Sequence, residues 1–388
     1  MEEESKGTSA AADSMIKGGR MASDHQNHPA APTITEVAAA AGVGRATVAR
    51  TLGNYGSVSE VTRAKVMRAA EKLGYQPNSL ARSMTTGVTK TLGIVLADVA
   101  NPFFSGVLKG ISETAKGAGY DAIILSTDEK LELERDAIAV LLAKQVDGLV
   151  VASAAGRSDD VSHLSNAVDR GTPVVLIDRL VDSLETDSVV IDNREAARAA
   201  VASLIRNGHR RIAFAWGPVT LSPATDLKQM HSILDEALWS DGERLRGYLD
   251  ALEEAGLPFD TDLITHVLKN EGQAARAVSG MLALADPPTA IFTTETEATV
   301  GALHALRARN LRLLKDVSLI GFDDSPWAAV MEPPLSMIQQ PMREMGAAAA
   351  QQLMARISGD TSAPKKHVLP SLLVARSSDG PVRASSSS

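Results

Sequence analysis

The chain has 388 residues, of which 44% are hydrophobic and 22% charged, and its formal net charge is -8 at pH 7. No apolar stretch approaches the roughly 18 residues that cross a bilayer, and the polar N-terminus lacks the apolar segment of an export signal. We therefore expect a cytoplasmic protein without a membrane span. The chain has no cysteine, which excludes disulfides, thiolate catalysis and zinc-cysteine sites.

The first segment, residues 1–32, is polar and is predicted to be a disordered tail. It contains His25 and His28, which could suggest a metal site. Two histidines in a polar segment are more often simply solvated, so we predict neither a metal nor a cofactor.

Residues 33–76 are predicted to form a helix-turn-helix domain. A first helix is expected over 34–41, and Gly42 ends it because glycine adopts the left-handed conformation without steric cost. A second helix is expected over 45–52, with Val48 and Leu52 inward. Such a unit is typical of proteins that read the major groove of DNA.

The outward side of the second helix carries Arg45, Ala46 and Arg50. Arginine can bind guanine through two hydrogen bonds, and a small residue such as alanine allows close approach to a thymine methyl group. We predict that these three side chains contact bases.

A third helix is signalled by Ser59 as its N-cap and Gly74 as its terminator, with an apolar stripe of Val66, Ala70 and Leu73. It would supply the third side of the bundle. An alanine-rich helical hairpin can also give such a pattern by chance, so the motif alone does not decide the function.

Charge supports a nucleic-acid partner for this end of the chain. Residues 33–92 contain eight lysines and arginines against three acids, although the whole chain is acidic. Local charge determines where a polyanion binds, and such binding weakens steeply with salt.

The motifs AGV, ATVAR, VSEVTRAKV, LGYQPNSLAR and NPFF follow one another over the headpiece and beyond. In this order and spacing they resemble the lac-repressor (LacI) family of bacterial transcription regulators. The resemblance implies that Arg45, Ala46 and Arg50 occupy the base-reading positions. Contacts to the DNA backbone, or support for those contacts, are expected from Thr35, Thr47, Asn54, Ser59 and Thr62.

The chain departs from the family in this headpiece. Gly44 and Ala49 stand where the family usually has serine, so a capping hydroxyl and a phosphate contact are missing.

Residues 77–90 are predicted to form a hinge helix and linker. The segment is too short for a stable isolated helix and should order only on DNA. The resemblance implies minor-groove contacts, with Met84 as an apolar wedge at the central base step. Alternatively, Met84 is a linker residue that covers the junction with the next domain. The hinge residues expected at the minor groove are Asn78, Leu80, Ala81 and Met84.

From Thr91 onward, short apolar runs alternate with amphipathic helical patterns, as in TLGIVLA, YDAIILS and DGLVVAS. This alternation predicts parallel sheets with helices on both faces, the α/β doubly wound plan. There are too many strands for one compact sheet, so residues 91–376 should form a two-lobed core like that of periplasmic binding proteins. The chain should cross between lobes near residues 187–192 and return near its C-terminus. A disordered tail is predicted over 377–388.

Ligands of such folds bind beyond the carboxyl ends of the strands. We expect a small-molecule effector there, contacted by polar and aromatic side chains. The alternative roles are helix capping for Asn101 and the aspartates, and core packing for the phenylalanines. The candidate effector-binding residues are Asp98, Asn101, Phe103, Phe104, Asp178, Arg179, Arg244, Glu295 and Asp323.

Three departures from the family concern this part of the chain. Glu295 and Thr296 stand where the family commonly has Asn-Asp, which would change an amide contact to a carboxylate. The segment 219–242 intervenes before Arg244; it could be a lid, an altered partner surface or a tolerated surface loop, and the last is the expectation. The leucine-rich heptad helix that some members use to tetramerise is missing, so we expect a homodimer.

The sequence thus predicts a DNA-binding regulator associated with the nucleoid, most simply a repressor of a near-palindromic operator, with a carbohydrate effector. A nucleobase or another metabolite is the alternative effector, and activation is the alternative mode. A cytoplasmic solute-binding protein would share the core but have no use for residues 33–84. An enzyme is not expected, because the chain contains no GxGxxG after a strand, no P-loop, no HExxH and no GxSxG.

Overall fold

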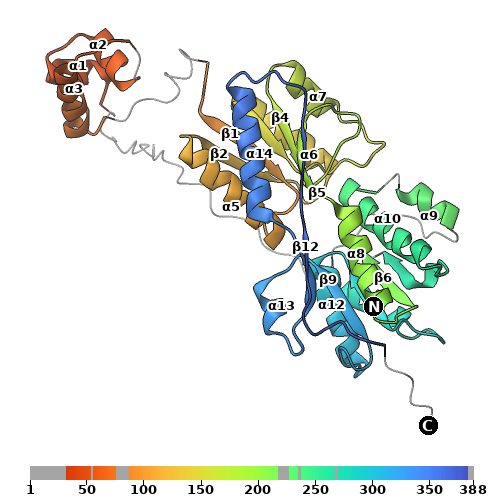
Figure 1. The fold of residues 1–388 in the computed structure, drawn as a ribbon. Helices are drawn as coiled ribbons and strands as arrows, with labels where there is room; N and C mark the ends of the chain where they lie inside the picture. Colours follow the sequence, from red (N-terminus) through yellow and green to blue (C-terminus); the bar gives the residue numbers. More distant parts are fainter. Residues whose placement is uncertain are drawn as a thin grey trace, which may run out of the picture. The chain divides into compact units, whose positions relative to one another are not determined.

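The computed structural model describes residues 32–53, 56–75, 87–216, 227–234, 237–266 and 270–382 (Figure 1). The chain divides into two compact units, residues 1–86 and 87–388. None of the helices in the described ranges combines the length and the apolar character that a membrane crossing requires.

The described residues of the first unit form three helices with the predicted bounds, which are α1 (Ile34–Ala41), α2 (Arg45–Leu52) and α3 (Glu60–Leu73). The Thr33 hydroxyl accepts a hydrogen bond from the Glu36 amide, and the Glu36 carboxylate accepts one from the Thr33 amide, so a capping box begins α1. Gly42 ends this helix with φ 66°, which glycine adopts without strain.

The core of the headpiece consists of small and β-branched residues from all three helices. Val37, Val48 and Val66 are fully buried and pack with Ala38 and Ala70. The expectation that Leu73 belongs to this apolar stripe is wrong, since its side chain is 37% exposed. Ala69, on the turn of α3 before Leu73, joins Val66 and Ala70 in the core instead.

The described residues of the second unit form two six-stranded sheets, which confirms the two-lobed α/β plan. The lobe 1 sheet is parallel throughout and has the order β11-β5-β4-β3-β1-β2. Its strands are β1 (Thr91–Leu96), β2 (Asp121–Ser126), β3 (Gly148–Val151), β4 (Val174–Ile177), β5 (Asp187–Ile191) and β11 (Lys366–Leu369).

Helices cover both faces of the lobe 1 sheet. One face packs against α5 (Pro102–Gly117) and α14 (Met342–Ile357), which lie side by side in Figure 1. The other face packs against α6 (Leu131–Ala143) and α7 (Ser162–Asp169). Strands β3, β4 and β5 are buried along their whole length, which explains why they read as continuous apolar runs.

The lobe 2 sheet repeats this plan with the order β12-β10-β9-β8-β6-β7. Only β12, among the described strands, runs antiparallel to its neighbour. The strands are β6 (Ile212–Trp216), β7 (Ile264–His266), β8 (Ala290–Thr293), β9 (Ser318–Phe322), β10 (Ser336–Gln339) and β12 (Leu372–Val374). The helices of this lobe are α8 (Asn193–Arg206), α9 (Leu227–Leu234), α10 (Trp239–Glu254), η1 (Thr261–Leu263), α11 (Glu271–Met281), α12 (Thr296–Ala308) and α13 (Pro326–Val330).

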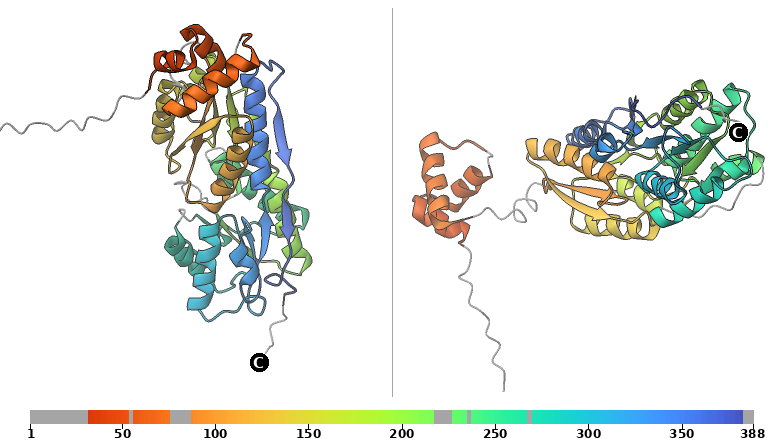
Figure 2. Two further views of the ribbon diagram at one scale, coloured as in Figure 1. Left: turned by 90° about the vertical axis from the view of Figure 1, so that its left-hand side faces the viewer. Right: turned by 90° about the horizontal axis from the view of Figure 1, so that it is seen from below.

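The chain passes between the lobes three times, rather than by the crossing and single return that we expected. It leaves lobe 1 after β5, returns between β10 and α14, and crosses again between β11 and β12. Figure 2 shows the two lobes joined by these segments. The strands β7, β10, β11 and β12 were not predicted. Strands β7, β10 and β11 mix polar with apolar residues over three or four positions, and β12 has only three residues, so none gives a distinct apolar run.

The segment 219–242 is not only a surface loop. Residues 227–234 form α9, and α10 already begins at Trp239. Met230 and Leu234 are buried and join the main hydrophobic core, because the apolar side of α9 faces α10.

The predicted C-terminal disorder does not hold for residues 377–382, which lie against lobe 2. Ser378 is fully buried; its hydroxyl donates to the Leu319 carbonyl oxygen at 2.6 Å and accepts from the Ser336 amide at 2.8 Å. His209 holds the same segment through the Gly380 carbonyl oxygen at 2.9 Å.

Close helix packing depends on glycines at helix contacts. A Cβ added at Gly110 of α5 would lie 2.0 Å from the Arg343 carbonyl oxygen, and one at Gly346 of α14 would lie 2.0 Å from the Val107 carbonyl oxygen. The two backbones therefore touch, with no room for a side chain.

We predict that Gly110→Ala separates α5 from α14 and lowers the free energy of unfolding by about 1 to 3 kcal/mol. Gly117→Ala in the same helix is the control, because a Cβ there meets nothing within 4 Å. It should be neutral or stabilise by up to about 1 kcal/mol. Thermal unfolding of both variants measures this, and equal midpoints would contradict the packing argument.

Candidate DNA-binding surface and inter-lobe site

The outward side of α2 carries the predicted base-reading residues. Arg45, Ala46 and Arg50 are all exposed, while Val48 and Thr51 on the opposite side are buried. The Arg50 Nε atom donates to the Ala46 carbonyl oxygen at 3.3 Å, so this side chain lies back along its own helix. The helix therefore presents two cations and a small residue to solvent, as a groove-reading helix requires.

The predicted supporting residues have mixed positions. The Ser59 hydroxyl accepts from the Thr62 amide at 3.3 Å and donates to the Thr62 hydroxyl at 2.9 Å, which caps α3. Thr35 is exposed and Thr47 half-buried. Gly44 stands at the N-cap of α2 without a side-chain hydrogen bond, in line with its missing hydroxyl. The remaining predictions lie outside the described residues, namely Asn54, Asn78, Leu80, Ala81 and Met84.

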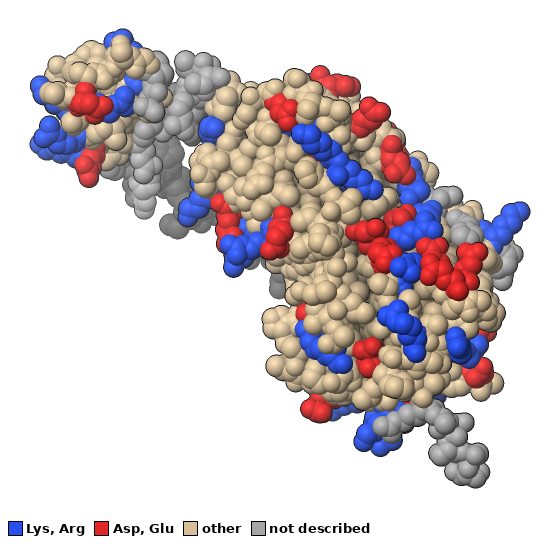
Figure 3. All heavy atoms as spheres, viewed as in Figure 1, with Lys and Arg blue, Asp and Glu red and all other residues tan. Residues whose placement is uncertain are grey.

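Charge is arranged differently on the two units. Figure 3 shows mainly basic side chains, with a few acidic ones, on the surface of the headpiece, whereas over α8 and α10 basic and acidic side chains gather together. There Arg194 pairs with Asp250, and Arg198 pairs with Glu254 at 3.0 Å. The cations of this core surface are thus neutralised by neighbouring acids.

Two aspartates occupy equivalent positions in the two lobes. Asp178 follows β4, the third strand from the β11 edge of its sheet, and Asp323 follows β9, the third strand from the β12 edge. Both are buried, and both have a left-handed backbone, with φ 68° and 67°. Aspartate tolerates this conformation better than most residues, and such backbone is often found at functional sites.

Arg179 is held by acids from both lobes. It is 3% exposed, pairs with Glu129, lies 3.3 Å from Asp178 through Nε, and donates from Nη1 to the Ser153 carbonyl oxygen at 3.1 Å. Burial alone would lower the pKa of its guanidinium. The carboxylates of Glu129 and Asp178, together with Asp241 of lobe 2, outweigh burial and raise it.

A buried glutamate holds the loop that contains Ser153. Glu134 is fully buried and accepts hydrogen bonds from the Ser153 hydroxyl at 2.9 Å and from the Ala154 amide. His163 Nε2 lies 2.8 Å from the same carboxylate. Glu134 therefore positions the carbonyl group that Arg179 contacts.

Arg244 is the corresponding cation of lobe 2. It is 5% exposed and donates from Nε to Asn193 Oδ1 and from Nη1 to the Thr294 carbonyl oxygen, each at 2.9 Å. Its guanidinium carbon lies 3.9 Å from the centre of the Phe322 ring, a cation-π contact. Arg244 thus joins α10, α8 and the ends of β8 and β9.

The Asp323 carboxyl connects these groups. Its Oδ1 accepts a hydrogen bond from Gln340 Nε2 at 2.6 Å. Burial raises its pKa above the ordinary value, and the Asp178 and Glu297 carboxylates raise it further, against the lowering effect of Arg244 and Gln340. Because Asp178 belongs to lobe 1, like charges of the two lobes face each other here.

Several buried polar atoms of this cluster have no hydrogen-bond partner. Four of the residues concerned, Asp178, Asn193, Thr294 and Gln340, are at most 4% exposed, and the fifth, Glu297, is half-buried. Leaving such a group unsatisfied costs about 1 to 3 kcal/mol, so each of these atoms is expected to bind something other than the protein itself. The atoms are Asp178 Oδ1, Asn193 Nδ2, Thr294 Oγ1, Glu297 Oε2 and Gln340 Oε1.

The structure therefore brings together four of the predicted effector residues, namely Asp178, Arg179, Arg244 and Asp323. Glu295 is buried directly after Thr294, at the start of α12. Of the remaining four, Asn101, Phe103 and Phe104 have the alternative roles that we considered, whereas Asp98 does not cap a helix but bonds the turn before α5. Asn101 Oδ1 caps α5 by accepting from the Phe103 amide at 2.9 Å, and Asp98 Oδ1 accepts from the Ala100 amide at 2.8 Å.

Phe103 and Phe104 are buried in the hydrophobic core, with their rings edge to face and 4.9 Å between centroids. A ligand contact by any of these four residues stays a prediction.

Sequence reasoning missed several residues of this site, namely Glu129, Asn193, Asp241, Thr294, Glu297 and Gln340. Asp241 could have been found, because it lies three residues before Arg244 and so shares a face of α10. Asn193 and Gln340 lie just beyond β5 and β10, where the chain changes lobes. No local pattern distinguishes such residues from ordinary helix starts.

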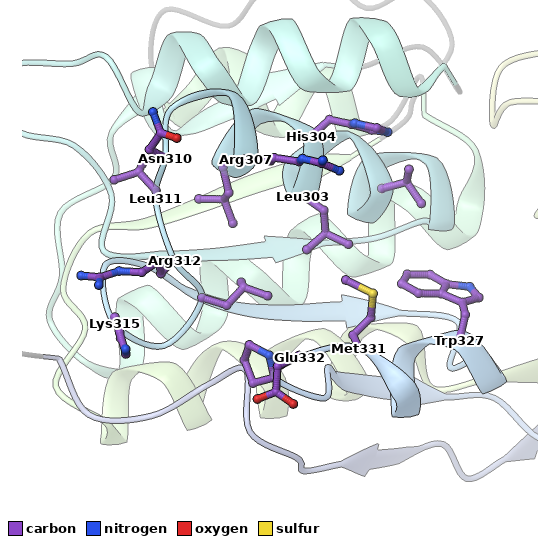
Figure 4. Close-up of a pocket in the computed structure, with 14 residues that line it drawn as sticks. Leu303, His304, Arg307, Asn310, Leu311, Arg312, Lys315, Trp327, Met331 and Glu332 are labelled. Carbon is purple, nitrogen blue, oxygen red and sulfur yellow. The ribbon is translucent and has the colours of Figure 1, made fainter.

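A separate cavity of about 820 Å³ lies on lobe 2 between α12, the loop after it and α13. Figure 4 shows Trp327 and Met331 on one side, facing Leu303, His304 and Arg307 of α12. It includes none of the predicted effector residues.

We predict that Asp323→Asn stabilises the ligand-free protein near neutral pH. The pKa of Asp323 is raised in the folded state. The protonated carboxyl therefore stabilises the fold at a pH below its ordinary pKa, and this stabilisation is lost as pH rises through the raised pKa. Asparagine tolerates the backbone at φ 67° and can still accept from Gln340. At about pH 7 each kcal/mol of stabilisation should raise the unfolding midpoint of the variant by about 2 °C, and the difference from the unsubstituted protein should narrow toward about pH 4. A lower midpoint at neutral pH would refute the prediction.

The comparisons with known proteins agree with both units. The family described as "Bacterial regulatory proteins, lacI family" matches residues 33–78. The family described as "Periplasmic binding proteins and sugar binding domain of LacI family" matches residues 89–376, which is more than half of the chain.

Whole proteins match as well. The HTH-type transcriptional regulator DegA of Bacillus subtilis is 33% identical, over 90% of this chain and 98% of its own. The structure of a complex of the transcriptional regulator CelR with cellobiose is 31% identical, with TM-score 0.65, over 89% of this chain and 99% of its own. The lac repressor dimer bound to operator and an anti-inducer is 23% identical and shows the same fold, with TM-score 0.77 over 90% of this chain and 99% of its own. The chain therefore belongs to the LacI family of bacterial transcriptional regulators.

Proposed function

We propose that this protein is a homodimeric repressor that binds a near-palindromic operator and whose affinity is controlled by a small molecule bound between the lobes. DNA binding is supported by the exposure of Arg45, Ala46 and Arg50 on one side of α2. Effector binding is supported by the buried polar cluster around Asp178 and Asp323, in which several atoms have no hydrogen-bond partner. A DNA-binding regulator of this kind acts in the cytoplasm, and no catalytic role is proposed.

In the proposed complex α2 lies in the major groove. Arg45 and Arg50 would contact guanine bases, and Ala46 would approach a thymine methyl group. The remaining cations of the headpiece would contact phosphates and add a salt-dependent, sequence-independent part of the affinity.

Two headpieces are needed to read two half-sites, so the protein should act as a symmetric dimer on a site of matching symmetry. We propose a carbohydrate as the effector, supported by the sugar-binding family of the core and by cellobiose in the CelR complex. The lobes would change their separation on binding, with a coupling free energy of roughly 1 to 3 kcal/mol.

The test is recovery of genomic DNA fragments by the full-length protein at moderate salt. Arg50→Ala should lose roughly tenfold in affinity for the recovered site, and preference for one base should be relaxed. Arg68→Ala is a matched control, because its Nε also bonds its own helix, to the Ala64 carbonyl oxygen at 3.2 Å. This variant removes the same charge from α3 and should keep the base preference.

A single near-palindromic site that Arg50→Ala weakens selectively supports the proposal. If both variants lose affinity equally on every sequence, α2 is not the reading helix. Transcription from the recovered promoter with and without the protein then distinguishes repression from activation.

A further inference from the structure

The polar side chains around Arg179 and Asp323, which we call the inter-lobe cluster, include more acids than bases. The groups that interact with Arg179 or with Asp323 include five carboxylates but only two guanidinium groups. Most of these side chains are less than a tenth exposed, so water screens them poorly. The carboxylates are Glu129, Asp178, Asp241, Glu297 and Asp323, and the guanidinium groups are Arg179 and Arg244.

The atoms without a hydrogen-bond partner likewise include more acceptors than donors. Asp178 Oδ1, Glu297 Oε2 and Gln340 Oε1 can only accept a hydrogen bond, and the Thr294 hydroxyl can accept or donate. The donors are Asn193 Nδ2 and Arg179 Nε, and the latter lies 3.3 Å from Asp178 Oδ2 without hydrogen-bonding geometry. The cluster thus lacks hydrogen-bond donors more than acceptors.

A metal ion does not fit this excess of acids. Among the residues that the structure describes, no group of three or more acidic or histidine side chains is placed to hold one. The acceptors are instead spread over the ends of β4 and β8, the start of α12 and Gln340 after β10. Such a spread suits an organic molecule whose polar groups point in several directions.

We propose that the effector carries a protonated amine together with several hydroxyl groups, as an amino sugar does. The inference rests on the proposed function and narrows the ligand class of the same site. An ammonium group offers three donors and no acceptor, which suits the carboxylates around Asp178, Asp323 and Glu297. Hydroxyl groups can accept from Asn193 and Arg179 and donate to Gln340.

The experiment uses the full-length protein and matched pairs of ligands, namely glucosamine with glucose and galactosamine with galactose, with the N-acetylated sugars as neutral analogues. Thermal shift and calorimetry at about pH 6.5 keep the amines charged. A ligand that binds only the folded protein raises its unfolding midpoint. In at least one pair, the amine should bind at least about tenfold more tightly than both neutral forms.

Glu297→Gln tests the site itself. It keeps the shape of the side chain and removes one carboxylate, so the preference for the amine should fall by about tenfold while the binding of neutral sugars changes little. Glu332→Gln is the matched control, because this glutamate is exposed and lines the other cavity of lobe 2. It should leave the preference unchanged.

The outcomes are distinct. Neutral sugars that bind as well as their amines in both pairs, or a panel in which no amine shifts the midpoint, overturn this inference even when the protein binds its operator. Failure to bind any DNA site overturns the proposed regulator function instead, and amine binding that depends on Glu297 would still support this inference.

Discussion

The core depends on the burial of opposing charges where its two lobes meet. Arg179 of lobe 1 interacts with Asp241 of lobe 2, while Asp178 and Asp323 bring like charges together. Because buried charges are costly without partners, the energy of this contact depends strongly on what lies between the lobes. A ligand that completes the missing interactions changes that energy, which gives the site a physical means of controlling lobe separation.

Within each lobe, the packing leaves little freedom. The α5 and α14 backbones touch at Gly110 and Gly346, and α8 touches α10 at Gly247, where an added Cβ would lie 2.1 Å from the Arg194 carbonyl oxygen. Interiors packed this closely move as units rather than deform. A change that starts at the inter-lobe cluster should therefore appear as a movement of whole lobes.

The headpiece is organised by local interactions instead. Its caps at Thr33 and Ser59 and its small valine and alanine core are contained within residues 33–75. The exposure of Arg45 and Arg50 follows from the periodicity of one helix. Base reading is thus a property of a short segment, whereas effector binding requires residues from many parts of the chain.

The sequence by itself determined the three headpiece helices, the doubly wound plan and the two lobes, because caps, periodicity and apolar runs are local signals. It also identified Asp178, Arg179, Arg244 and Asp323, since strand ends and one helix motif point to them. Only the tertiary structure decided that Leu73 is exposed, that 227–234 forms a helix with Met230 and Leu234 buried, and that Asp241, Asn193 and Gln340 join the cluster. These facts arise from contacts between segments far apart in sequence, and such contacts leave no periodic pattern in either segment.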